Sequence, residues 1–154
     1  MEEQRTTITM SEIMTPDQAN FAGNIHGGHL LCFLDKVAYA CAARYCGKYV
    51  VTLSVDQVVF KQPIHVGDLI TCLASVNHVG HSSMEIGIKV ISENLTTGTV
   101  HHTNSCFFTL VALDENHKPT QVPPLQCHSD EQKRRFNEAE LRKKMRIELD
   151  QKNK

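Results

Sequence analysis

Asp35 is the residue whose type and surroundings most clearly suggest chemistry. It lies in HLLCFLDKVAYACAARYC, residues 29–46, where the other charged side chains are Lys36 and Arg44. Lysine and arginine reach water with long stems, but a short aspartate in a buried stretch needs a polar partner, a solvent-lined cleft or a raised pKa. Such a carboxylate can act as a general base or a nucleophile. The alternative is an exposed strip of helix on which Asp35 pairs with Arg or Lys.

The segment just before this stretch, FAGNIHGGHLL, places His26, Gly27 and Gly28 at the expected start of a helix. The first backbone N–H groups of a helix lack intrahelical acceptors, and the helix dipole favours negative charge there. This start is therefore a candidate oxyanion site, with a simple tight turn as the alternative. His26 and His29 also raise the question of a metal, but no third ligand follows at a suitable spacing, so we predict no metal site.

The spacing of these residues limits how they can cooperate. Asp35 lies seven positions after Gly28, which is about 10 Å along a helix axis, and Asn24 lies farther away still. Both side chains cannot hold one small reacting group within a single chain. If Asn24 and Asp35 serve one site, we expect a two-fold dimer in which each helix start faces the partner's carboxylate.

The elements that position these residues follow from periodicity and turn signals. Apolar residues on nearly every face predict a helix over 28–46 that is buried on most sides and ends at Gly47. The flanking text predicts strands, most clearly over 82–92, where alternation indicates one buried and one solvated face. One long helix against a mostly antiparallel sheet is an α+β arrangement. The predicted strands are 6–14, 49–60, 68–79, 82–92 and 99–113.

The C-terminal segment differs in character from the rest of the chain. Beyond Pro123-Pro124 it is highly charged, and Ser129 with Gln132 predicts a capping box. The apolar stripe of the helix that follows is thin, which favours a solvated tail helix over packing against a neighbouring subunit. We therefore divide the chain into a domain over 6–123 and a charged helical tail over 124–154.

Composition narrows the function classes further. Sixteen basic and seventeen acidic residues leave no net field for nucleic acid or an anionic membrane. Six cysteines without a C-x-x-C pair, several within apolar runs, indicate a reducing compartment. The first ten residues lack the apolar stretch of a signal peptide, and no apolar run is long enough to span a bilayer. We expect a cytoplasmic protein that does not enter a membrane.

These residues resemble the hotdog-fold acyl-CoA thioester hydrolases, both the cytosolic type and its bacterial short- to medium-chain relatives, over roughly residues 6–123. In the family pattern an Asn or Asp precedes an aromatic or His and two glycines, and an acidic residue follows eleven positions after the first. Here these are Asn24, His26, Gly27, Gly28 and Asp35. The resemblance implies a long central helix wrapped by five to six antiparallel strands. It also implies hydrolysis of fatty acyl-CoA without a cofactor.

Two further segments resemble family features. VTLSVDQVVFKQPIHVGD, residues 51–68, is similar to the edge strand and turn, and VGHSSMEI, residues 79–86, is similar to the turn that contacts CoA. Relatives often have Arg where this chain has His81, and a neutral His would hold phosphate less firmly. The alternative for the second segment is a plain hairpin turn. The candidate CoA-binding residues are Lys61, Gly80, His81, Ser82 and Ser83.

The resemblance also implies an assembly and a mechanism. Dimers would join their sheets, hexamers would be trimers of dimers, and the acyl chain would lie in an apolar tunnel between subunits. Asp35 would activate water or attack the thioester, helped by Asn24 of the other chain. Two alternatives stay open: a hotdog hydratase or dehydratase pairing His26 with Asp35, and a non-catalytic acyl-CoA sensor. Core packing is the alternative for each tunnel candidate, which are Phe33, Val37, Val58 and Phe60.

Overall fold

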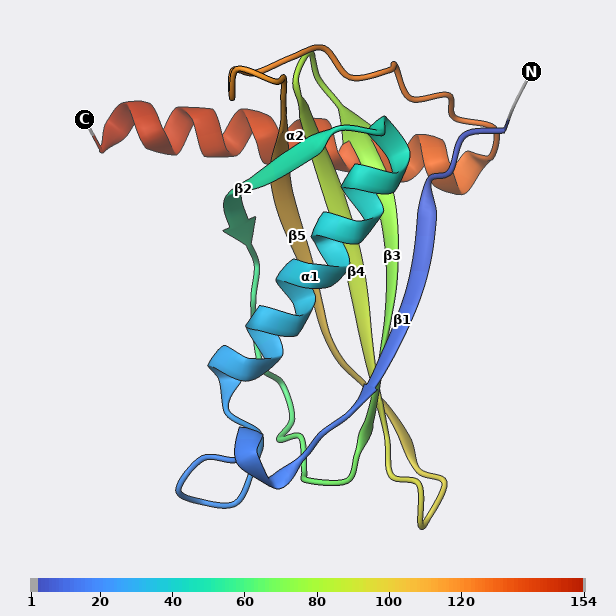
Figure 1. Cartoon of the computed structure of the whole chain (residues 1–154), viewed down its shortest axis with the longest axis vertical. Coiled ribbons are helices and arrows are strands. Elements are labelled where there is room, and N and C mark those ends of the chain that lie inside the picture. The colour runs from blue at the N-terminus through green and yellow to red at the C-terminus, as the bar shows by residue number, and fades with distance from the viewer. Residues whose placement is uncertain (1–2, 154) are drawn as a thin grey trace.

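The fold consists of two long helices and one sheet (Figure 1). The computed structural model describes residues 3–153. Outside the described residues lie Met1 and Glu2 of the N-terminal segment and Lys154 of the predicted tail. A 3-10 turn, η1, spans Pro16–Gln18. The other elements are β1 (Thr7–Ile13), α1 (Gly27–Cys46), β2 (Tyr49–Asp56), β3 (Leu69–Val79), β4 (Ser83–Glu93), β5 (Val100–Leu113) and α2 (Asp130–Lys152).

The five strands form one antiparallel sheet in the order β1-β3-β4-β5-β2. The sheet curves around α1, which crosses its inner face (Figure 1). The predicted α+β arrangement of one long helix against an antiparallel sheet is confirmed. Because β1 and β2 are the two ends of this order, each leaves one edge unpaired within the chain.

Helix α1 is amphipathic rather than buried on most sides, which corrects the expectation from its composition. His26 is its N-cap, and Gly47, with φ of 68°, ends it in the left-handed conformation that glycine adopts without steric cost. The opposite face is exposed and carries His29, Cys32, Asp35 and Lys36. The buried face consists of Leu30, Phe33, Leu34, Val37, Ala38, Cys41, Ala42 and Cys46.

The core lies between this buried helix face and the inner face of the sheet. In β4, Met84, Ile86, Ile88 and Val90 all point inward and are at most 2% exposed, as the alternating pattern predicts. Cysteines pack among them as small apolar groups. Burial raises the pKa of the Cys41, Cys72 and Cys106 thiols to about 12. These thiols are structural and stay protonated near neutral pH.

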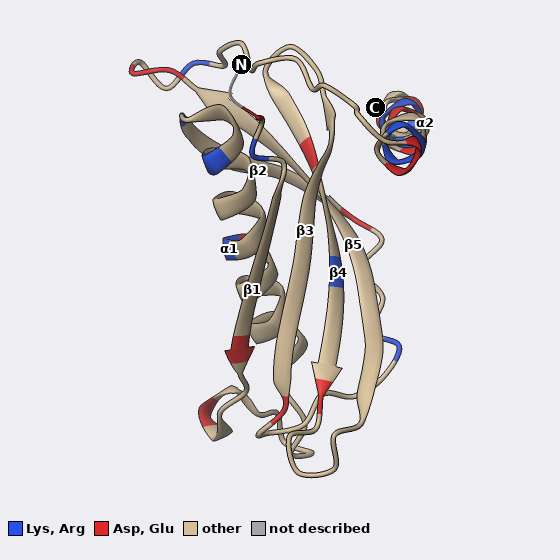
Figure 2. Ribbon diagram, turned by 90° about the vertical axis from the view of Figure 1, so that its right-hand side faces the viewer, with Lys and Arg blue, Asp and Glu red and all other residues tan. Residues whose placement is uncertain are grey.

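Helix α2 packs across part of the outer face of the sheet, so the prediction of a solvated face is wrong for Glu85. Most residues of α2 are exposed, as predicted for the tail helix, but the helix is docked on the sheet. Figure 2 shows α2 end-on, beside the sheet face opposite α1. Its residue Ala139 is 1% exposed, and Glu85 is only 6% exposed beneath it. Composition hides this contact because the helix packs through arginines rather than through an apolar stripe.

Ion pairs fasten α2 to the sheet. Arg142 makes a bidentate pair with Glu85, with N···O distances of 2.7 and 3.1 Å, and its guanidinium lies 3.6 Å from the centre of the Phe107 ring. One turn later, Arg146 donates to Asp56 at 2.9 Å. The predicted capping box of Ser129 and Gln132 is confirmed at the start of the helix. Because Arg142 and Arg146 are four residues apart, they share one face of α2.

Strand boundaries agree with the predictions within one residue, with one exception. The strand predicted over 49–60 ends at Asp56, because Gln57 has a φ of 60° and leaves the extended conformation. Residues 57–68 then form the connection to β3. No helix within residues 3–153 is long and apolar enough to cross a membrane.

Candidate active site

Asp35 lies on the exposed side of α1, and its partner is a hydroxyl group rather than a cation. Thr52 Oγ1 donates a hydrogen bond to Asp35 Oδ1 over 2.6 Å. Thr52 pairs with Leu110 in the sheet, and Leu110 points into the core. Residues directly opposite in an antiparallel pair share a face, so Thr52 points towards α1. The exposed strip of helix predicted as the alternative is therefore confirmed for Asp35, but its partner is Thr52 and not Arg or Lys.

Thr52 is a site residue that sequence reasoning missed, although a signal for it was present. In YVVTLSVD the period of two places Thr52 on the same face as Val50, which is buried against the helix. A polar residue on that face is unusual and needs a partner. The register of β2 shifts between Thr52 and Ser54, and such bulges re-aim side chains near functional sites.

Replacing Thr52 with valine tests this contact. The substitution keeps the shape of the side chain but removes the hydroxyl that orients the Asp35 carboxylate. Because a hydrogen bond to a charged group is involved, we expect the rate of a reaction that uses the Asp35 carboxylate to fall roughly tenfold while the fold is retained. Thr71→Val is the matched control, since its hydroxyl contacts only Ser11 on an exposed surface. Equal rates for the two variants would exclude an orienting role for Thr52.

The start of α1 leaves one backbone donor available. His29 and Leu30 donate their N–H groups to the carbonyl oxygen of His26, and Gly28 donates to Nδ1 of the same histidine at 3.2 Å. Among the first four N–H groups of the helix, only that of Gly27 has no acceptor within residues 3–153. Of the two predicted oxyanion donors, Gly27 and Gly28, only Gly27 therefore keeps its N–H available. The role of His26 here is to cap the helix.

The free N–H of Gly27 lies beside a small cavity. Asn24, half-buried in the loop before α1, lines it together with Gly27, Phe60 and Ile64, and its volume is about 220 Å³. The Phe60 ring packs so closely that a methyl group on Gly27 would lie 3.3 Å from it. The Phe60 ring therefore lies in close contact with the helix start. Two residues predicted from the motif, Asn24 and Gly27, are brought together here.

Asp35 lies away from this cavity. Eight residues separate it from Gly27 within α1, which is about 12 Å along the helix axis. Each chain therefore carries two separate half-sites. One is the carboxylate with Thr52, and the other is the helix start with Asn24.

The predicted CoA-binding residues also fall into two groups. Gly80 to Ser83 lie at the turn between β3 and β4. This position agrees with the predicted CoA-contacting turn and with the alternative of a plain hairpin turn. Lys61 is exposed in the connection that precedes β3. The eleven residues of β3 separate these two places by about 30 Å. One chain does not bring Lys61 to the turn.

The four tunnel candidates differ in their exposure. Val37 is 0% exposed and Phe33 is 7% exposed, so both belong to the core of the single chain. Val58 is half-buried, and Phe60 is 49% exposed at the helix start. Only Val58 and Phe60 present substantial surface outside the core. For Phe33 and Val37, core packing accounts for their positions.

Comparison with known proteins places this fold and site in a family. The model of the thioesterase superfamily matches residues 22–104, which is more than half of the chain. Protein VdlD of Helicobacter pylori is 54% identical over 92% of this chain and 81% of its own. The chain belongs to the thioesterase superfamily and is a thioester hydrolase by that membership.

Two solved structures are similar over nearly the whole chain. A hexameric acyl-CoA thioesterase in its apo form has a TM-score of 0.89 and 36% identity, covering 94% of this chain and 93% of its own. An acyl-CoA hydrolase from Staphylococcus aureus, solved with butyryl-CoA and CoA, has a TM-score of 0.83 and 30% identity, covering 96% and 93%. Further structures of the S. aureus enzyme carry alanine in place of an aspartate, an asparagine or a threonine. These similarities confirm the hotdog fold and the resemblance to acyl-CoA hydrolases.

Proposed function

We propose that this chain hydrolyses fatty acyl-CoA thioesters to CoA and a carboxylic acid, with Asp35 as its catalytic carboxylate. The observation that carries the proposal is the accessible Asp35 carboxylate, oriented by the Thr52 hydroxyl at 2.6 Å, on the central helix of a thioesterase fold. The S. aureus relative was solved with butyryl-CoA, and its alanine variants replace the three residue types found here at Asp35, Asn24 and Thr52.

In this mechanism Asp35 either removes a proton from the attacking water or attacks the thioester carbonyl itself. The Thr52 hydrogen bond occupies Oδ1 and leaves Oδ2 for the reacting group. The Gly27 N–H, at the positive end of the helix dipole, stabilises the oxyanion, and the Asn24 amide orients the water or the carbonyl. The leaving group is a thiolate, which needs little protonation.

The two half-sites belong to different subunits of a homodimer in this proposal. The 12 Å between them within α1 is too long for one carbonyl group, whereas a two-fold axis would place each helix start opposite the partner's Asp35. The unpaired edge strand β2 supports this, since Leu53 is 67% exposed and Val55 is 37% exposed there. A hexamer built as a trimer of dimers is the expected assembly, and one relative is a hexamer.

The acyl chain would lie near Val58 and Phe60, the two tunnel candidates with accessible surface. CoA would contact the turn from Gly80 to Ser83, and Lys61 would contribute from the other subunit. The free cysteines, four of them buried, support a reducing, cytoplasmic location. The hydratase alternative would have to transfer its proton through Nε2 of His26, because Nδ1 accepts the Gly28 N–H.

A thiol-release assay tests the activity directly. We expect the wild-type chain to release CoA from at least one of acetyl-, butyryl-, hexanoyl- and palmitoyl-CoA. The chain-length profile would identify the substrate class, because an apolar pocket discriminates between acyl chains that differ by a few methylenes. Binding of acyl-CoA without release would instead favour a sensor. Addition of water to an enoyl-CoA would favour the hydratase.

Mixed subunits test the shared site. Asn24→Ala and Asp35→Asn chains, each inactive alone, are refolded together so that hybrid dimers form. Half of the sites in a hybrid receive both intact groups, so we expect activity to return in the mixture. Refolding each variant alone is the control. Hybrids that form but remain inactive would contradict a site built from two chains.

A further inference from the structure

The turn between β3 and β4 is held by backbone hydrogen bonds, one of them within the hairpin, from the Gly80 N–H to the carbonyl oxygen of Ser83 at 2.9 Å. The carbonyl oxygen of His81 accepts from the Val122 N–H at 2.8 Å, and that of Ser82 accepts from the Ala112 N–H at 2.9 Å. The C=O and N–H of a trans peptide point in opposite directions. The Ser82 N–H is therefore directed away from Val122, whereas the Ser83 N–H lies on the Gly80 side of β4.

Helix α2 brings a cation to the same turn. A methyl group on Gly80 would lie 2.9 Å from Lys143 Nζ and also 2.9 Å from Ser83 Oγ. An ammonium group and a hydroxyl thus converge on the space above Gly80. His81, the residue at the tip of the turn, is exposed. Lys143 is the lysine that α2 places at this turn.

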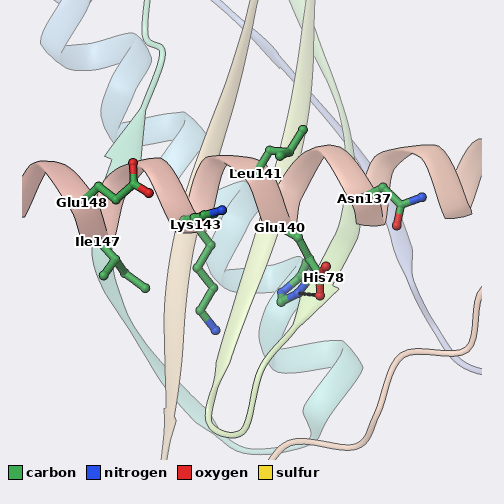
Figure 3. Close-up of a pocket in the computed structure, with 8 residues that line it drawn as sticks. His78, Asn137, Glu140, Leu141, Lys143, Ile147 and Glu148 are labelled. Atoms are coloured by element: carbon green, nitrogen blue, oxygen red, sulfur yellow. Dashed lines mark hydrogen bonds and ion pairs between the residues drawn. The ribbon is translucent and has the colours of Figure 1, made fainter.

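The position of Lys143 follows from how α2 is fastened. Its neighbours Arg142 and Arg146 are committed to Glu85 and Asp56, and these pairs fix the rotation of the helix. Within residues 3–153, Lys143 itself takes part in no ion pair. Figure 3 shows it on the side of α2 that borders the β3–β4 hairpin, where it also lines a groove with His78, Leu141 and Ile147. The fold keeps one half-buried ammonium at this turn without an ion-pair partner among residues 3–153.

We propose that Lys143 of α2, together with the turn from Gly80 to Ser83, binds the diphosphate of coenzyme A. The inference rests on the proposed function and adds a residue from the C-terminal helix to its substrate site. Glu85 of β4 is paired with Arg142, and Glu140 of α2 contacts His78 at 3.4 Å, while Glu140 and Glu148 line the same groove as Lys143. The geometry makes α2 a wall of the CoA site and not only a cover for the sheet.

Steady-state kinetics of Lys143→Gln test the proposal. Because one charge-assisted hydrogen bond to phosphate is lost, we expect KM for acyl-CoA to rise roughly tenfold while kcat stays within twofold. Acyl-dephospho-CoA retains the diphosphate, so its KM should rise equally. An acyl-pantetheine thioester has no phosphate, so the variant and the wild type should hydrolyse it equally well. Lys143→Arg should restore most of the affinity.

Lys133→Gln is the matched control, since Lys133 is an exposed lysine on the same helix. It should leave KM unchanged for all three substrates. An unchanged KM of Lys143→Gln for acyl-CoA overturns the proposal, and so does an equal rise for acyl-pantetheine, which indicates a structural role. An effect limited to substrates with the 3′-phosphate overturns the assignment to the diphosphate. Failure of the wild-type chain to hydrolyse any acyl-CoA counts against the proposed function instead.

Discussion

Asp35→Asn is expected to lower kcat by about 10³-fold, the range over which a positioned general base acts. Asparagine is nearly isosteric and its carbonyl oxygen still accepts the Thr52 hydrogen bond, so the local structure should be preserved. What is lost is the negative charge that activates water or attacks the carbonyl carbon. The measurement is initial-rate hydrolysis of the preferred acyl-CoA, with thermal unfolding to confirm an unchanged fold.

A matched control for this variant is Glu93→Asn, which removes a carboxylate from the last residue of β4. It should change neither kcat nor KM appreciably. If the Asp35 variant kept its rate within about threefold of the wild type, neither the base nor the nucleophile role would be tenable. KM should change little, because the carboxylate acts mainly in the transition state.

Arg142→Met is expected to have the largest effect on stability. Glu85 has a side-chain exposure of 7% and Arg142 of 15%, so removing the guanidinium leaves a buried carboxylate without its counter-charge. Breaking a buried pair in this way typically lowers the free energy of unfolding by about 3–5 kcal/mol. Loss of the cation–π contact with Phe107 adds to the effect. Urea unfolding of the purified protein, followed by circular dichroism, measures the difference.

Arg134→Met provides the comparison on the same helix. Arg134 also pairs with glutamates, but its side-chain exposure is 58%, and exposed pairs contribute at most about 1 kcal/mol. The double variant Glu85→Met/Arg142→Met should recover most of the lost stability, because no unpaired charge remains. A loss for Arg142→Met no larger than that for Arg134→Met would show that α2 is held by other contacts.

Much of the fold could be predicted because local signals and long-range packing agree. The alternation in β4, Gly47 after the helix and the capping box at Ser129 each depend on residues close in sequence, and each has the predicted place. The end of β2 was predicted wrongly because the apolar text continues past Gln57, whose positive φ nothing in the composition indicates. The covering of Glu85 was missed for a related reason. A highly charged helix gives no apolar stripe from which its docking face can be read.

For the candidate site, the sequence alone determined that Asp35 lies within the central helix and that Asn24 and Gly27 lie at its start. It also determined that the two ends are too far apart to act on one group within a chain, since helix rise is independent of context. The tertiary structure decided which partners these groups have. Thr52 approaches Asp35 across 17 positions, and Arg142 reaches Glu85 across 57.

Only the folded chain could show that His26 engages the Gly28 N–H, so that Gly27 remains the free donor. The same holds for Lys143 beside Gly80, a contact between a helix and a turn that no local pattern links. The physical reason is common to all of these. Residue type and spacing limit what a side chain can do locally, whereas the direction in which it points and the group it meets depend on how distant elements pack.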